Sequence, residues 1–200
     1  RTNPDLLDTQ LRAIASVAAT GPTAVMAPMV ATLDDARWFR SRVEAAAMPA
    51  HVEVGVMVEV PALALTADQL SPYVDFVSIG TNDLGQYLFA ADRRDEAMAE
   101  LLDPFAPALL RAVASVCRGM AGEAWIGICG EAASDPAWAL LAVGLGVTEL
   151  SMQAVAIPEV RAALRTVTVE ACRAAATRAL ACASAVEARE IGTSLVKETT

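Results

Sequence analysis

The hydrophobic and polar positions of the chain alternate between short apolar runs and longer helical patterns. Apolar runs of strand length predict five buried strands, at residues 24–30 (AVMAPMV), 52–60 (VEVGVMVEV), 74–79 (VDFVSI), 125–129 (WIGIC) and 148–152 (TELSM). Helical patterns occupy the intervals, at about residues 32–47, 61–70, 107–120, 137–144, 158–164 and 169–183. Strands that are nearly continuously apolar and that alternate with helices predict a parallel sheet covered by helices, in the α/β class.

The start of the helix at residue 32 carries a specific signal. Thr32 is an N-cap candidate, and Asp35 stands three residues further on. This spacing is a weaker form of the capping box, in which Glu or Gln occupies the later position. We therefore expect the helix to begin directly after Thr32.

Polar residues at the strand ends distinguish between two parallel architectures, the open doubly wound sheet and the TIM barrel. Glu59, Asn82 with Asp83, and Cys129 with Glu131 lie at the carboxyl ends of different predicted strands. In a TIM barrel these ends converge on one face, where such enzymes keep their sites. No G-x-G-x-x-G follows the first strand, so the dinucleotide-binding interpretation lacks its main support.

The number of strand–helix units is smaller than a whole barrel requires. Five units are predicted, whereas a (β/α)8 barrel has eight units in about 250 residues. We expect residues 1–183 to form the C-terminal part of the barrel, about its last five units. Residues 184–200 are expected to be a helical end or a tail.

Bulk composition narrows the possible functions. The chain has 200 residues, 55% of them hydrophobic, and a net charge of -9 without a basic run, which disfavours nucleic acid as a partner. No apolar stretch of spanning length and no signal peptide is found, so we expect a cytoplasmic protein without membrane insertion. The four cysteines form no C-x-x-C pair, and the one histidine, His51, is expected to lie in an exposed loop with a structural role.

Two carboxylates at successive strand ends form the first candidate site. Glu59 ends the second predicted strand, and Asp83 follows the third. A few hard oxygen ligands with room for water and substrate oxygens describe a Mg²⁺ site. The same residues also fit a simpler interpretation, in which Glu59 caps the following helix and Asp83 caps its own loop.

Three further segments contain candidate chemistry. Asn82, in the Gly-Thr-Asn-Asp segment, can donate to a phosphate or carboxylate oxygen, and Arg93 can bind a phosphate through its guanidinium fork. The Cys129 thiol, within the Gly-Ile-Cys-Gly-Glu segment that ends at Glu131, can serve as an acid or a nucleophile. An ordinary turn, a charged helix end and a core cysteine explain Asn82, Arg93 and Cys129 equally well when each is taken alone.

Taken together, these segments resemble Enzyme I of the bacterial phosphoenolpyruvate:sugar phosphotransferase system, a family of PEP-utilising enzymes. The resemblance runs from about Gln10 to Leu180, in matching order and spacing. It rests on the following segments: QLRAI at 10–14, APM at 27–29, GVMVEVPA at 55–62, VDFVSIGTNDLGQYLFAADR at 74–93, GICGE at 127–131 and LGVTELSM at 145–152. The Gln86-Tyr87 pair and the Ala-Asp-Arg ending favour Enzyme I over the related pyruvate phosphate dikinase and phosphoenolpyruvate synthase.

The resemblance implies a TIM barrel that binds phosphoenolpyruvate (PEP) and Mg²⁺ at the carboxyl ends of its strands. Glu59 and Asp83 match the two metal-binding carboxylates, and Asn82 matches a residue in contact with substrate. Arg93 matches a phosphate-binding arginine. Cys129 matches the cysteine that protonates the enolate carbon as pyruvate forms, and Glu131, in the same pocket, matches a nearby acid.

The sequence also departs from the family pattern. The family transfers the phosphoryl group to a histidine on a separate swivelling domain and then to the phosphocarrier protein HPr; that domain is absent from this chain, and His51 falls in no matching motif. Two substrate-binding arginines of earlier strands are absent too, and Gly85 replaces a larger residue. We therefore expect the chain to be one portion of a longer polypeptide and to be inactive alone. The resemblance also implies a homodimer that forms through the barrel.

Three alternatives stay open at this point. The Enzyme I-like part of a multiphosphoryl transfer protein shares the same barrel and differs in the domains that precede it. A dikinase, a PEP synthase or a citramalyl-type lyase barrel would carry related Mg²⁺-enolate chemistry. A non-catalytic dimerisation or regulatory module would form a dimer without Mg²⁺-dependent ligand binding.

Overall fold

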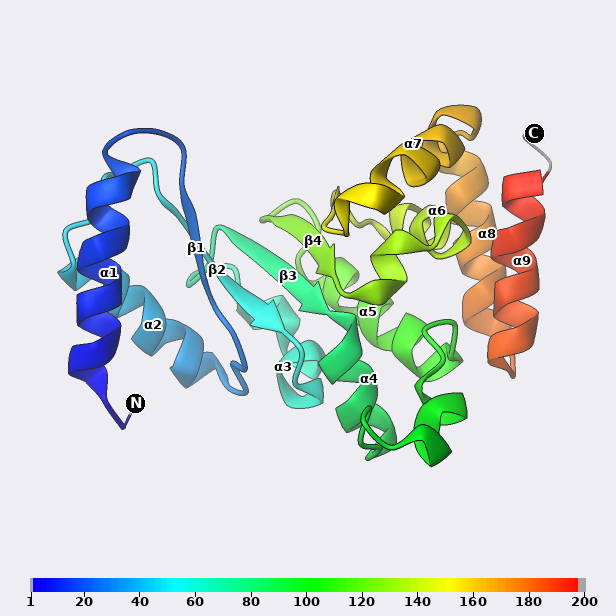
Figure 1. Ribbon diagram of the computed structural model, residues 1–200, viewed down its shortest axis with the longest axis horizontal. Coiled ribbons are helices and arrows are strands. Elements are labelled where there is room, and N and C mark those ends of the chain that lie inside the picture. The colour runs from blue at the N-terminus through cyan, green and yellow to red at the C-terminus, as the bar shows by residue number, and fades with distance from the viewer. Residues whose placement is uncertain (1, 198–200) are drawn as a thin grey trace.

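The computed structural model describes residues 2–197 and contains one parallel sheet covered by helices (Figure 1). The sheet has five strands: β1 (Ala24–Ala27), β2 (Glu53–Val58), β3 (Phe76–Gly80), β4 (Trp125–Cys129) and β5 (Glu149–Leu150). The α-helices are α1 (Pro4–Ala18), α2 (Leu33–Ala45), α3 (Pro61–Leu65), α4 (Thr81–Phe89), α5 (Pro107–Gly119), α6 (Pro136–Leu145), α7 (Ile157–Thr166), α8 (Val169–Ala181) and α9 (Ala185–Lys197). Short 3-10 helices are η1 (Ala67–Gln69), η2 (Glu96–Leu102), η3 (Glu131–Ser134) and η4 (Ala154–Ala156).

The strand order identifies the architecture. The strands are parallel and lie in the consecutive order β1-β2-β3-β4-β5. Consecutive parallel neighbours joined by right-handed crossovers place the connecting helices on the same face of the sheet. A doubly wound sheet reverses its strand order and has helices on both faces. The fold is therefore part of a TIM barrel, as the positions of the polar residues predicted.

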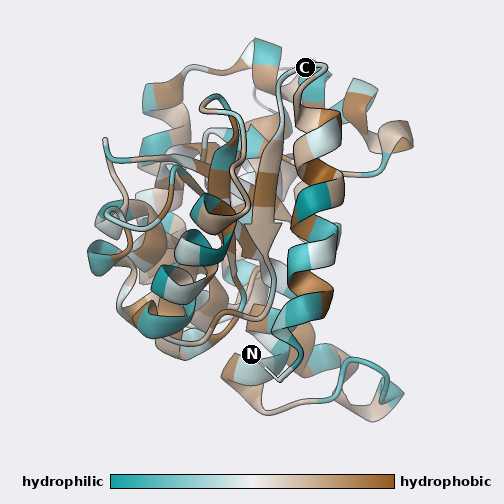
Figure 2. Ribbon diagram, turned by 90° about the vertical axis from the view of Figure 1, so that its left-hand side faces the viewer, coloured by the Kyte–Doolittle hydropathy of each residue, from teal (hydrophilic) through white to brown (hydrophobic). Residues whose placement is uncertain are grey.

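The two faces of the strands have different environments. On β2, Val56 and Val58 point toward the helices and belong to the main hydrophobic core, whereas Met57 lines the opposite face. The main core lies between the sheet and the helices, and Phe105 and Trp138 are among its fully buried members. The strands are accordingly mostly apolar, while the surrounding helices mix apolar and polar positions (Figure 2). Among residues 2–197, no helix combines the length and the apolar character needed to cross a bilayer.

The five predicted strands are confirmed, although all except β4 are shorter than their apolar runs. β1 ends at Ala27 because Pro28 has no backbone N–H and Met29 adopts a left-handed conformation with φ of 53°. The predicted capping box is also confirmed: the Thr32 hydroxyl accepts a hydrogen bond from the Asp35 N–H, and the Asp35 carboxylate accepts one from the Thr32 N–H.

Several helical elements differ from the prediction. Helix α1 was not predicted, and the helix expected over 61–70 is divided between α3 and η1. The Gly80–Leu84 segment, interpreted as a turn, instead begins helix α4. Cys182, expected within a helix, lies at the C-cap of α8. Residues 184–200 were expected to be a helical end or a tail. Of these, Ala185–Lys197 form helix α9, in agreement with the first alternative, and residues 198–200 lie outside the described part of the chain.

Candidate functional site

Two carboxylates lie together at the carboxyl ends of β2 and β3. Because these strands are parallel neighbours, with Val58 paired to Ile79, Glu59 after β2 comes close to Asp83 in the first turn of α4. Glu59 is buried, with 4% of its surface exposed, and its Oε1 accepts a hydrogen bond of 2.7 Å from the Met29 N–H. Burial raises the pKa of the Glu59 carboxyl, the Met29 N–H opposes this shift, and the Asp83 charge adds to it.

The backbone around Glu59 is shaped to hold its side chain. The Met29 N–H is directed at the carboxylate from a left-handed conformation, which is costly for a residue with a side chain and is typical of functional sites. On the other side, a Cβ at Gly80 would lie 2.8 Å from Glu59 Oε2. Only glycine therefore leaves room for the carboxylate at the end of β3.

Asn82, Arg93 and Glu131 line one pocket of about 400 Å³ above the strand ends. The Asn82 Oδ1 accepts a hydrogen bond of 3.3 Å from the Glu131 N–H. Gly130, between β4 and η3, has φ of 118°, and a Cβ there would lie 2.4 Å from the Thr81 Oγ1. The loop after β4 is thus packed tightly on the first turn of α4.

Two arginines, Arg93 and Arg94, line this pocket, and Arg94 is paired with Asp92. Arg93 is the candidate phosphate-binding cation. It also lines an adjoining hollow of about 480 Å³ together with Asp83, so both groups open toward the same space. The Arg93 charge lowers the pKa of Glu59, although burial outweighs this effect. The Arg93 N–H is held by Gln86 Oε1 at 3.3 Å, which ties the arginine segment to helix α4.

Cys129 ends β4, and its side chain borders the concave face of the sheet. The thiol donates a weak hydrogen bond to the Ile79 carbonyl, at 3.7 Å, while the Thr81 hydroxyl donates to the Cys129 carbonyl, at 3.1 Å. Burial raises the pKa of the Cys129 thiol; a hydrogen bond with Ser78 opposes the shift, and the nearby carboxylates, Glu59 foremost, reinforce it. The thiol therefore stays protonated to higher pH than an ordinary cysteine.

The six residues singled out in the sequence are brought to one rim of the sheet. Three contributors were missed: the Met29 N–H, Ser78 and Thr81. Ser78 had a visible signal, since it is a polar residue inside the apolar run VDFVSI. His51 precedes β2 and so lies at the other end of the sheet, in the exposed loop expected for it, with its ring Nε2 2.8 Å from the Ala18 carbonyl oxygen.

Glu59 and Asp83 are compatible with a magnesium ion that takes most of its ligands from water and substrate. Within residues 2–197, no cluster of three or more His, Cys, Asp and Glu side chains is arranged to share a metal. Glu59 and Asp83 offer two carboxylates, both hard oxygen donors. Mg²⁺ is usually held by one or two carboxylates plus water and substrate phosphate oxygens, so these residues fit that ion.

The geometry defines a class of site, a parallel barrel face with paired acids, and comparison with known proteins identifies the family of the chain. Residues 1–169 match the family described as PEP-utilising enzyme, PEP-binding domain. The chain belongs to this family.

Similar proteins include phosphoenolpyruvate-protein phosphotransferases and multiphosphoryl transfer proteins. The chain is 47% identical to a phosphoenolpyruvate-protein phosphotransferase of Streptomyces coelicolor, over 94% of the chain and 34% of the relative. It is 44% identical to a protein of the same name from Haloferax volcanii, over 94% of the chain and 35% of the relative. It is 38% identical to multiphosphoryl transfer protein 1 of Escherichia coli, over 96% of the chain and 24% of the relative. The chain thus spans about a third or less of these relatives.

Proposed function

We propose that this chain is the PEP- and Mg²⁺-binding part of a phosphoenolpyruvate-protein phosphotransferase of the Enzyme I type. The observation that carries the proposal is the pair Glu59 and Asp83, held side by side at two strand ends with Arg93 and Cys129 around them. Such a set provides an ion site, a phosphate-binding cation and a proton donor at the carboxyl ends of neighbouring strands, which are the groups needed to release pyruvate from PEP. The family match and the printed names of the relatives support the same assignment.

Each residue has a distinct task in this proposal. Glu59 and Asp83 hold Mg²⁺, which when bound neutralises phosphate charge and stabilises the enolate. Arg93 binds the phosphoryl oxygens through its fork, and Asn82 orients the substrate by hydrogen bonds. Glu131 follows the Gly130 turn and borders the same pocket, where its carboxylate limits how substrate can lie.

Cys129 completes the chemistry. When the P–O bond of PEP breaks and the phosphoryl group leaves for a histidine on another domain, enolpyruvate remains. Its methylene carbon takes the thiol proton of Cys129, the C–O bond becomes the ketone of pyruvate, and the resulting thiolate regains a proton from solvent. The raised pKa of Cys129 keeps the thiol protonated at neutral pH, as a general acid requires.

The remaining parts of the proposal concern the whole protein. We propose that residues 1–183 belong to the barrel domain and that 184–200 form its helical end. Mg²⁺ is the proposed cofactor, HPr the proposed phosphoryl acceptor through domains outside this chain, and a homodimer through the barrel the proposed assembly. The multiphosphoryl transfer proteins are a second candidate class, favoured by identities of 38–41% over at least 94% of the chain. The domains preceding the barrel in the intact polypeptide distinguish the two classes.

Titration calorimetry of PEP into the intact polypeptide, with and without Mg²⁺, tests the proposal. Asp83→Ala removes one of two protein ligands of the ion, so we expect Mg²⁺-dependent binding to weaken by about 100-fold or more. Asp68→Ala, which removes an exposed carboxylate in η1, is the matched control and should bind as the wild type does. Unchanged affinity in Asp83→Ala would remove the assignment of the metal site.

A further inference from the structure

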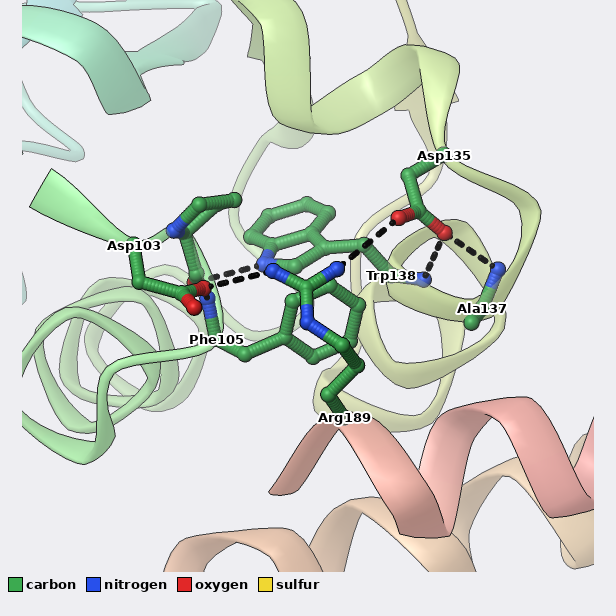
Figure 3. A network of polar contacts seen from close by, with 7 residues as sticks. Asp103, Phe105, Asp135, Ala137, Trp138 and Arg189 are labelled. Atoms are coloured by element: carbon green, nitrogen blue, oxygen red, sulfur yellow. Dashed lines mark hydrogen bonds and ion pairs between the residues drawn. The ribbon is translucent and has the colours of Figure 1, made fainter. Parts of the chain in front are cut away.

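A side-chain network behind the substrate pocket joins the C-terminal helix to the two loops that form the pocket wall. Arg189 of α9 places its guanidinium between Asp103, which follows η2, and Asp135, which precedes α6 (Figure 3). The Arg189 Nη2 lies 2.9 Å from Asp103 Oδ1, and the Nη1 lies 3.5 Å from Asp135 Oδ2. The guanidinium carbon also sits 4.2 Å from the centroid of the fully buried Phe105 ring.

Both carboxylates also accept hydrogen bonds from the backbone, in addition to their ion pairs with Arg189. Asp103 Oδ1 accepts a hydrogen bond of 2.9 Å from the Phe105 N–H, which fixes the turn after η2. Asp135 Oδ1 accepts hydrogen bonds from the first turn of α6, from the Ala137 N–H at 2.8 Å and the Trp138 N–H at 3.2 Å. Arg189 therefore connects the end of one loop to the cap of a helix.

The two connected segments both line the site. The loop from Arg93 to Asp103 contributes Arg93 and Leu102 to the pocket that Glu131 also lines, and Pro104, directly after Asp103, lines it too. The loop that ends at Asp135 begins directly after Cys129 and contains Glu131. The distance between the phosphate-binding side and the proton-donating side is thus set by segments that meet at Arg189.

The indole of Trp138 makes a second connection between the same segments. Its Nε1 donates to the Pro104 carbonyl at 2.8 Å, so the start of α6 is joined to the loop after η2 without Arg189 (Figure 3). The two connections differ in kind, because the Trp138 side chain is fully buried whereas Arg189 and its partners are partly exposed. Loss of Arg189 would leave two carboxylates without the cation between them, and like charges disfavour close approach. The pocket walls would then separate while the core contact of Trp138 preserved the fold.

We infer that Arg189 is a positioning residue, which acts through Asp103 and Asp135 to hold Arg93 and the Cys129–Glu131 segment at the spacing that PEP requires. The inference rests on the proposed function. It assigns helix α9 a role in the site although none of its residues lines the pocket above the strand ends. An arginine suits this position because its planar fork can reach two carboxylates and stack on a ring at once, which a lysine ammonium cannot do.

The test compares Arg189→Met with Arg178→Met in the intact polypeptide. Arg178 is exposed on the neighbouring helix α8 and forms no ion pair within residues 2–197, so it controls for the loss of one surface charge. We expect Mg²⁺-dependent PEP binding to weaken about tenfold in Arg189→Met and to stay within twofold of wild type in Arg178→Met, since misplacement by 1 Å can cost up to about 10²-fold. Arg189→Lys should fall between wild type and Arg189→Met.

Two further measurements separate positioning from general stability. Hydrogen exchange should become faster at residues 92–106 and 130–138 of Arg189→Met and unchanged in the strands. Asp103→Asn should weaken PEP binding by itself and add less than twofold when combined with Arg189→Met, because both changes break one connection. A loss of stability alone would lower the melting temperature without weakening binding measured well below it.

The outcomes are distinct. Equal PEP affinity in Arg189→Met and wild type, equal weakening in the two methionine variants, or independent losses for Asp103→Asn and Arg189→Met would each overturn the inference and leave the proposed function intact. A wild type without Mg²⁺-dependent binding would overturn both. Selective weakening with faster exchange in the two loops would support the positioning role.

Discussion

The two ends of the sheet are built from the same strands and use opposite chemistry. At the amino end, Phe76 and Trp125 stack with ring centroids 4.2 Å apart and planes 1° apart. The Phe76 ring fills the space beside Gly55, where a Cβ would lie 2.4 Å from it, and the Trp125 indole donates to Glu53 at 3.2 Å. The two rings pack closely on Gly55 and on each other, and the backbone at these positions is free of positive-φ strain.

At the carboxyl end the same strands hold features that reduce stability. Glu59 is a buried acid with a raised pKa, and Met29, which carries a side chain, adopts a left-handed conformation. Burying an acid and straining the backbone both cost free energy and persist where a ligand uses them. The contrast indicates that stability is concentrated at one end of the sheet and ligand binding at the other, as TIM barrels divide them.

The largest effect on activity is expected from Cys129→Ser, a change at the carboxyl end of the sheet. A hydroxyl is a far weaker acid than a thiol, so pyruvate formation in the intact polypeptide should slow by about 10²–10⁴-fold, the usual contribution of a general acid. PEP affinity should change by less than about threefold, because the replacement keeps size and hydrogen bonding. Rapid-quench assay of pyruvate measures the rate, with Cys182→Ser as control. Unaltered turnover would show that another group donates the proton.

The opposite end should respond in stability and not in binding. Phe76→Ala removes a buried ring and its stacking contact with Trp125, so we expect the free energy of unfolding to fall by about 3–5 kcal/mol. Denaturant titration measures this loss, and calorimetry at a temperature where the variant is folded should show PEP affinity near that of wild type. Phe76→Leu, which keeps much of the apolar volume, should lose less. A loss of affinity equal to that of Asp83→Ala would contradict the division between the two ends.

The smallest expected effect is a gain in the stability of the ligand-free protein, from Glu59→Gln. Because the folded-state pKa of Glu59 is raised above its ordinary value of 4.5, the stability contributed by this group is present below that value and is lost as pH rises through the raised pKa. Glu59→Gln keeps an oxygen for the Met29 N–H without the charge. We therefore expect the ligand-free variant to be more stable than wild type at neutral pH, with the difference disappearing toward pH 4. Thermal melts across this range would reveal it, and a less stable variant at neutral pH would show that ionised Glu59 supports the fold.

Local sequence patterns were enough to predict the five strands and the rim of the sheet at which the candidate site residues meet. Period and composition define buried strands, and parallel order then brings residues such as Glu59 and Asp83 together without further information. An ordinary turn was one of the two interpretations of the Gly80–Leu84 segment, whereas the structure begins helix α4 there and packs the buried Leu84 in the core. Tertiary packing overrode the local propensity there.

Long-range contacts were beyond the reach of sequence reasoning. The Met29 N–H bonds to a carboxylate thirty residues away, and Arg189 reaches Asp103 across 86 residues. An arginine in a charged terminal helix has the same sequence pattern whether it is solvated or bridges two loops. The expectation of a helical end or a tail at 184–200 therefore did not include the contact that helix α9 makes behind the site.

The central claim is that an ion and PEP meet at Glu59 and Asp83. The most direct measurement is the paramagnetic broadening of the ³¹P signal of PEP by Mn²⁺, which substitutes for Mg²⁺, in the intact polypeptide and in the Glu59→Gln/Asp83→Asn double variant. The account predicts strong broadening with wild type, because the ion touches the phosphate on the protein, and broadening no greater than that of free Mn²⁺–PEP with the variant. Equally strong protein-dependent broadening with the double variant would contradict the account, since the ion would then be held elsewhere.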